Sequence, residues 1–178
     1  MMQIEDILLR PITLEATQNI IQWRNSDFVR KHFVYQKEFT KESHEEWMNT
    51  MVSPGKVAQF IIHAVPMGKD IGSVFLRDID PIHQKAEFGI FVGDPAARGK
   101  GFGTMAAKGI IQFGFEKLQL HKIFLRVFAE NPAAIASYQK AGFIIEGHMV
   151  DDVCIDGEFK DMIFMGILNP RGKQEVKR

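Results

Sequence analysis

The stretch that decides the fold is GDPAARGKGFGTMAAKGIIQFGFEKLQ, which runs from residue 93 to residue 119. It follows a strand-like run, AEFGIFV, at residues 86–92. After the glycines, apolar residues recur three or four positions apart, which places them on one face of a helix. The members of this face are Phe102, Met105, Ala106, Gly109, Ile110 and Phe113. The pattern predicts a strand, a glycine-rich loop and a helix in succession.

The glycine-rich loop has the features of an anion-binding site. Backbone N–H groups at a helix start lack intrahelical acceptors and carry the positive end of the helix dipole. Gly99, Gly101 and Gly103 leave room for a ligand, and Arg98 and Lys100 add positive charge. A phosphate or pyrophosphate is the expected ligand. The loop matches neither a Walker A motif nor a dinucleotide fingerprint, so it does not identify that ligand.

A second motif follows a buried strand predicted at residues 122–129, KIFLRVFA. It reads ENPAAIASYQKAGF at residues 130–143, and Asn131 and Pro132 are typical of the first positions of a helix. Gly142 is typical of a position just past a helix end. We therefore expect a helix over residues 131–141.

Together the two motifs resemble the GCN5-related N-acetyltransferase (GNAT) family. The family's acetyl-CoA loop, Arg/Gln-x-x-Gly-x-Gly/Ala, is matched by Arg98, Gly101 and Gly103. Its second signature is an Asn before a helix that carries a Tyr and ends in Gly-Phe. The matching residues are Asn131, Tyr138, Gly142 and Phe143. The resemblance extends over most of the chain and implies acetyl-CoA as co-substrate.

Composition indicates one domain over residues 1–170 and a basic tail at 171–178, which we expect to be disordered. A formal net charge of zero gives no support for a nucleic-acid partner. The single cysteine, Cys154, suits a reducing compartment. No apolar run is long enough to span a membrane, and the scattered histidines indicate no metal site. We expect a cytoplasmic protein without a membrane or metal partner.

The order of the expected elements predicts a mixed α/β fold. Strands are expected at 7–12, 58–65, 71–78, 85–92, 122–129, 144–150 and 153–168, and helices at 13–25, 26–32, 39–51, from 102 onward and at 131–141. Asp156-Gly157 is a hairpin signal, and Asp151-Asp152 is interpreted as a turn. We expect a mostly antiparallel central sheet flanked by helices. The GNAT resemblance implies that its middle strands splay apart at the acetyl-CoA site.

The resemblance also assigns residues to acetyl-CoA and to the leaving group. Tyr138 is the candidate acid that protonates the leaving thiolate, although a tyrosine packed in the core is the alternative. Asn131 resembles the pantetheine-binding Asn of the family, and it also suits a helix cap. Backbone N–H groups of Phe91 or Val92 are the expected donors to the thioester oxygen. The full set expected at acetyl-CoA is Ile90, Phe91, Val92, Arg98, Gly99, Lys100, Gly101, Phe102, Gly103, Thr104, Asn131, Ala134 and Tyr138.

The general base is left open by the sequence. Glu87 lies on the strand beside the expected pocket, where its carboxylate could act directly or through a water. An ordinary charged strand residue is an equal alternative. His44, His83 and His148 are further candidates, whereas His121 is expected to be structural. In many GNAT proteins a chain of waters removes the proton.

The acceptor is expected to be a small amine. Residues 22–30, QWRNSDFVR, and the helix with His44 resemble bacterial nucleotide-sugar N-acetyltransferases of the pseudaminic acid pathway, which implies the 4-amino group of a UDP-amino sugar. The residues expected to bind it are Trp23, Arg24, Arg30, His44 and Glu87. The alternative places Trp23 in the core and the arginines in solvent.

Other acceptors and another class stay open. Residues 87–157 also resemble spermidine N-acetyltransferases, and a polyamine pocket would use acidic residues such as Glu42, Glu45, Glu46, Asp151 and Asp152. Ribosomal-protein N-terminal acetyltransferases share the layout. A non-catalytic acyl-CoA-binding scaffold is the hypothesis from another class. A homodimer is possible because the closing strands offer free edges.

Overall fold

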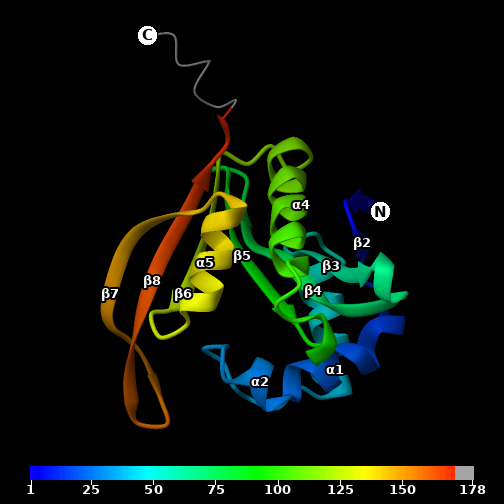
Figure 1. Cartoon of the computed structure of the whole chain (residues 1–178), viewed down its shortest axis with the longest axis horizontal. Helices are drawn as coiled ribbons and strands as arrows, with labels where there is room; N and C mark the ends of the chain where they lie inside the picture. The colour runs from blue at the N-terminus through cyan, green and yellow to red at the C-terminus, as the bar shows by residue number, and fades with distance from the viewer. Residues whose placement is uncertain (171–178) are drawn as a thin grey trace.

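The computed structural model describes residues 1–170, and the basic tail expected at 171–178 lies outside them. The strands are β1 (Met2–Ile4), β2 (Ile7–Pro11), β3 (Ala58–Ala64), β4 (Lys69–Asp80), β5 (Lys85–Val92), β6 (Lys122–Phe128), β7 (Ile144–Ile155) and β8 (Glu158–Leu168). The helices are α1 (Thr17–Asn25), α2 (Asp27–Arg30), α3 (Lys41–Trp47), α4 (Phe102–Glu116) and α5 (Pro132–Ala141). Figure 1 shows helices packed around one twisted sheet.

The strands form one sheet in the order β1-β2-β3-β4-β5-β6-β8-β7. Every neighbouring pair is antiparallel except β5 and β6, which are parallel. The predicted mixed, mostly antiparallel α/β sheet is confirmed. The sequence did not predict β1, a three-residue strand that a tight turn at Glu5, with φ of 48°, folds back onto β2.

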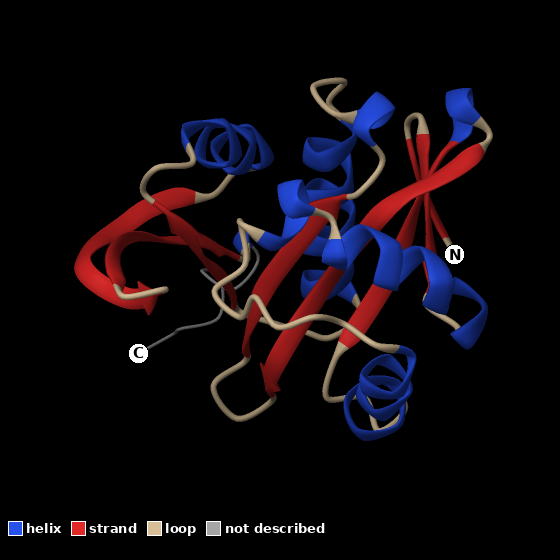
Figure 2. Ribbon diagram, turned by 90° about the horizontal axis from the view of Figure 1, so that it is seen from below, coloured by secondary structure: helices blue, strands red, loops and turns tan. Residues whose placement is uncertain are grey.

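The sheet splays where its two parallel strands meet. β5 pairs with β6 only through residues 85–87, which face residues 122–124. From Phe88 to Val92, β5 keeps its pairing with β4 but has none with β6. Figure 2 shows β6, β8 and β7 diverging as a separate wing from the rest of the sheet. The predicted splay is thus confirmed, and it opens beside α2 and α5.

The glycine-rich loop leads α4 onto the middle of the sheet. Two glycines on α4 allow this close packing. A Cβ on Gly109 would meet Leu9 Cδ1 at 2.9 Å, and one on Gly114 would meet Ile123 Cδ1 at 2.8 Å. These glycines let α4 pack closely against β2 and β6.

The closing hairpin differs in detail from its prediction. The turn at Asp156-Gly157 is present, and Gly157 takes the positive φ of 85° that such turns need. Asp151-Asp152 is not a turn between strands, because β7 continues through it as a bulge. Asp151 has a φ of 52°, and its N–H donates to Asp161 at 2.9 Å. Among the described residues, no helix has the length and hydrophobicity needed to cross a membrane.

Candidate active site

The splay encloses a cavity of about 310 Å³, which we call the main cavity. One wall is β5 from Glu87 to Val92, and the facing wall is β6 from Leu125 to Phe128. Helix α5 adds Asn131, Ala134 and Tyr138, and the loop after α2 adds Phe33 and Tyr35. The cavity thus brings together predicted residues from both motifs, namely Glu87, Ile90, Phe91, Val92, Gly103, Asn131, Ala134 and Tyr138.

The glycine-rich loop has the geometry of an anion site. Gly99 and Gly101 have positive φ values of 72° and 85°, which side chains with a Cβ rarely adopt. Met105 N–H donates to Gly101 at 3.1 Å, so the amides of Phe102, Gly103 and Thr104 precede the first helical hydrogen bond. They fit a pyrophosphate group, which the helix dipole also favours.

Gly103 is a glycine that packing within the chain does not explain. It lies in the first turn of α4 and lines the main cavity. A Cβ there would come no closer than 3.7 Å to another atom, Val92 Cγ2, so the fold itself does not require a glycine. The space it leaves is consistent with a ligand that approaches the backbone.

The cations of the loop do not both face this space. The Arg98 guanidinium donates to the carbonyl oxygens of Val92 at 3.3 Å and Gly93 at 3.0 Å. It also lies 3.5 Å from the centre of the Phe28 ring. Arg98 therefore ties the loop to β5 and α2, while the exposed Lys100 supplies the free positive charge.

The backbone of β5 supplies amides to the splay. Gly93 N–H donates to Ile71 of β4 at 2.8 Å. Because hydrogen-bonding direction alternates along a strand, Phe91 N–H also points to β4, whereas those of Ile90 and Val92 point into the splay. The Val92 carbonyl, which Arg98 contacts, points the same way. This geometry favours Val92 over Phe91 as a donor to a thioester oxygen.

Tyr138 presents its phenol to the main cavity. Its ring packs edge-on against Phe88 at 5.6 Å and Phe143 at 6.2 Å, so the ring is part of the core. The phenol oxygen has no hydrogen-bond partner among the described residues. Burial raises the pKa of Tyr138 to about 12, which keeps the phenol protonated at neutral pH. The side chain is thus a proton donor without a protein acceptor.

Asn131 caps α5 and also faces the main cavity. Its Oδ1 accepts from Ala134 N–H at 3.2 Å, as expected for a cap. Its Nδ2 lies 3.3 Å from His32 Nδ1, which the sequence analysis did not select. Burial lowers the pKa of His32. Thr104 is bound to Ser137 of α5 at 2.8 Å, which fixes the two helices around the cavity.

Glu87 is buried at one end of the main cavity and is held by two arginines. Its Oε2 accepts from Arg77 Nη2 at 3.0 Å, and its Oε1 lies 3.7 Å from Arg126 Nε. Arg126 also reaches Asp152 on the β7 bulge at 3.7 Å. Both carboxylate oxygens of Glu87 are engaged, so protonation of Glu87 would disturb an ion-pair network. Sequence patterns did not reveal Arg77 and Arg126, which come from separate strands.

The residues expected to bind the acceptor separate into two groups. Trp23 is buried in a core cluster with Phe91, at 6.4 Å, and does not line the main cavity. Arg30 is exposed and pairs with Asp27 at 3.0 Å, so it does not line it either. Arg24 and His44 line a second cavity of about 230 Å³. This second cavity shares Phe33, Tyr35, Phe75, Arg77 and Phe91 with the main one.

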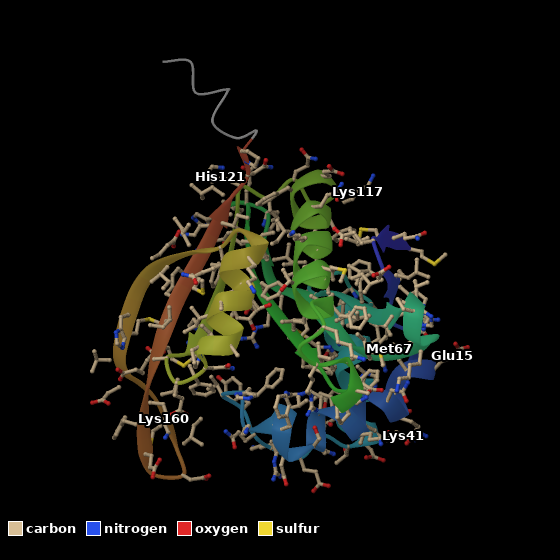
Figure 3. All side chains as sticks on the ribbon, viewed as in Figure 1. Glu15, Lys41, Met67, Lys117, His121 and Lys160 are labelled. Carbon is tan, nitrogen blue, oxygen red and sulfur yellow. The ribbon has the colours of Figure 1, made fainter. Side chains whose placement is uncertain are left out.

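The other histidines lie away from the cavity. His83 Nδ1 bonds Asp80 Oδ2 at 2.8 Å in an exposed loop, and His148 Nε2 bonds Asp161 Oδ2 at 2.7 Å on the closing hairpin. Figure 3 places His121 at the end of the molecule opposite α1 and α2. No group of three potential metal ligands occurs among residues 1–170.

A family model described as "Acetyltransferase (GNAT) domain" matches residues 6–144. The chain belongs to the GNAT acetyltransferase family. Among characterised relatives, a spermidine N(1)-acetyltransferase of Vibrio cholerae is 35% identical over 127 residues, which cover 71% of this chain and 72% of the relative.

Solved structures agree with this membership. A spermidine N-acetyltransferase from Vibrio cholerae in complex with CoA and spermine superposes with a TM-score of 0.85 at 30% identity and covers 92% of this GNAT chain and 96% of the other. A dodecameric structure of that enzyme, in an intermediate state, has a TM-score of 0.80 at 28% identity, with coverages of 97% and 99%. The GNAT chain is accordingly an acetyl-CoA-dependent N-acetyltransferase.

Proposed function

We propose that this protein acetylates the primary amine of a small molecule by direct attack on acetyl-CoA in a ternary complex. The observation that carries the proposal is the splay itself. Glu87, Val92 and Tyr138 all line the main cavity there, which supports their roles in this transfer. The free amides at the start of α4 hold the pyrophosphate, and the pantetheine lies between β5 and β6.

In the proposed reaction the amine nitrogen attacks the thioester carbonyl carbon. The carbonyl oxygen gains negative charge, which Val92 N–H stabilises. The C–S bond then breaks while the C–N bond remains, and the thiolate takes a proton from Tyr138. The amine loses its extra proton to water or to Glu87. Tyr138 regains its proton from solvent after the products leave.

Three acceptor classes are worth separating. Polyamines are the class that the comparisons favour, because the relatives from Vibrio cholerae and Escherichia coli and the solved structures are spermidine N-acetyltransferases. However, the acidic residues expected for them do not gather at the cavity: Glu42 and Glu46 are exposed on α3, and Asp152 pairs with Arg126. A UDP-amino sugar would have to place its diphosphate at Arg24, which lines the second cavity. Free protein N-termini form a third class.

An acceptor panel tests the proposal. The protein and acetyl-CoA are incubated separately with spermidine, a UDP-4-amino sugar and a peptide with a free N-terminus. The masses of the products are measured by mass spectrometry. We expect one small amine to gain an acetyl group. Acetylation of the peptide alone would overturn the small-molecule assignment. Acetyl-CoA binding without transfer to any amine would favour the acyl-CoA-binding scaffold.

We also propose that the protein works in the cytoplasm, as its single cysteine suggests, and that several copies assemble. The support for assembly is an apolar surface on the closing hairpin. Ile144, Ile145, Val150 and Phe159 are 50–72% exposed there, and β7 pairs only with β8 among the described strands. Light scattering that gives the mass of one chain would contradict assembly.

A further inference from the structure

The second cavity contains two buried polar atoms that the described chain leaves without partners. They are Arg24 Nη1, on α1, and His44 Nε2, on α3. His44 is fully buried. Buried polar groups are nearly always hydrogen-bonded, and an unpaired buried charge is especially costly. This pair therefore calls for a hydrogen-bond partner that the described chain does not supply, either a water or a ligand.

The Arg24 guanidinium is held flat between aromatic rings. It lies 3.5 Å from the centre of Phe33 and 5.3 Å from the centre of Phe39. No carboxylate of the described residues forms an ion pair with it. Burial and the positive charge of Arg77 lower the pKa of Arg24 to about 10, so it remains a cation at neutral pH. Its charge is fixed in place and has no counter-ion.

Apart from the exposed Tyr35, the remaining polar side chains around the second cavity have partners within the chain. Trp47 Nε1 donates to Gln59 Oε1 at 2.9 Å, and Gln59 Nε2 donates to Ser73 at 3.0 Å. Arg77 is held by Glu87. None of the lining residues is acidic. The second cavity therefore offers one free cation and one free ring nitrogen within aromatic walls.

We propose that the second cavity is a subsite for a carboxylate carried by the acceptor, so that the substrate is a small amino carboxylate. The proposal rests on the proposed N-acetyl transfer. Because the two cavities share Arg77 and Phe91, an amine beside Tyr138 and a carboxylate at Arg24 can belong to one molecule. A carboxylate oxygen is the acceptor that Arg24 Nη1 lacks among the described residues. A diphosphate would leave further oxygens facing aromatic rings, and a polyamine would place a cation beside Arg24.

Because of His44, carboxylate binding at this subsite should depend on pH. Thr17 donates its hydroxyl proton to the Leu14 carbonyl at 2.6 Å, so it accepts from His44 Nδ1–H at 3.0 Å. The Nε2 of neutral His44 is then an acceptor, and it must gain a proton to bind a carboxylate oxygen. The charged or titratable groups around it are Arg24 from α1, Glu45 from α3, Arg77 from β4 and Tyr35 from the loop. Carboxylate binding should therefore strengthen as the pH falls.

The test compares amines that differ only in their far end. The ω-amino carboxylates from β-alanine to ε-aminocaproate are each paired with the alkylamine and the diamine of equal chain length. We expect one amino carboxylate to exceed its two counterparts in kcat/KM by about tenfold or more. Arg24→Met should abolish that preference by lowering kcat/KM for the amino carboxylate toward the value for its alkylamine counterpart, whereas Arg30→Met, on the exposed arginine of α2, should leave the preference unchanged.

A binding measurement separates this inference from the proposed function. Melting temperature is recorded with the preferred amino carboxylate, without acetyl-CoA, for the wild type, Arg24→Met and Arg30→Met. The subsite is supported if the melting temperature rises in the wild type and in Arg30→Met but not in Arg24→Met, and if the rise is larger at pH 6 than at pH 8. This result supports the subsite even where no acetyl transfer occurs. Two results in this experiment would overturn the subsite: an equal rise in melting temperature in all three proteins, or no rise in the wild type. In the rate assay, a preference for spermidine or a UDP-amino sugar that Arg24→Met leaves unchanged would also overturn it.

Discussion

Replacing Tyr138 by Phe tests the role of the phenol directly. The substitution removes one oxygen that has no protein partner and keeps the ring that packs on Phe88 and Phe143. The free energy of unfolding should therefore change by no more than about 0.5 kcal/mol. Acetyl-CoA affinity should stay within about twofold. The loss should fall on kcat.

The size of that loss follows from the acidities of the two groups. General acid catalysis contributes roughly 10²–10⁴-fold. Burial raises the pKa of Tyr138 to about 12, whereas a thiol has a pKa of roughly 8.5, so proton transfer to the thiolate is uphill. We therefore expect the lower end, about 100-fold in kcat.

The assay is thiol release at saturating acetyl-CoA and amine, with calorimetry for CoA affinity. An unchanged kcat in Tyr138→Phe would refute the acid role. A loss of CoA affinity or of melting temperature that accounts for the whole effect would show that Tyr138 is structural.

Three further outcomes are expected. Gly103→Val should weaken acetyl-CoA binding about tenfold or more by calorimetry, because its side chain fills space that the fold leaves open; unchanged affinity would refute the loop assignment. Gly93→Ala should destabilise the protein by about 3 kcal/mol in urea unfolding, since its Cβ would lie 2.0 Å from Trp23 Cγ; a wild-type midpoint would contradict this packing. Glu87→Gln should lower kcat/KM about tenfold, because it leaves Arg77 unpaired beside the amine. Full activity of this variant would mean that water alone removes the proton from the amine.

Local sequence patterns predicted the strand, the glycine-rich loop and the helix starts at the proposed acetyl-CoA site. Positive φ at Gly101 and the Asn131 cap are properties of a few neighbouring residues, so short motifs predict them. The strand-like run at residues 86–92 likewise predicted β5. These features depend on contacts close in sequence.

The acceptor half depends on contacts that sequence spacing does not reveal. Trp23 and Arg24 are neighbours, yet one is in the core and the other faces the second cavity, because α1 packs on β5 and α3 at once. Two arginines hold Glu87. Arg77 on β4 lies 10 residues before it in the sequence, and Arg126 on β6 lies far after it. The β7 bulge, too, arises from pairing with β8.

The measurement that tests the central claim most directly is the initial rate of thiol release with both substrates varied. Direct transfer in the splay predicts intersecting lines in the double-reciprocal plot, and protein incubated with acetyl-CoA alone should gain no mass. Cys154, the one thiol, is exposed on the closing hairpin and lines neither cavity, so it is not placed to carry an acetyl group. Parallel lines together with an acetylated protein that passes its acetyl group to the amine would contradict the account.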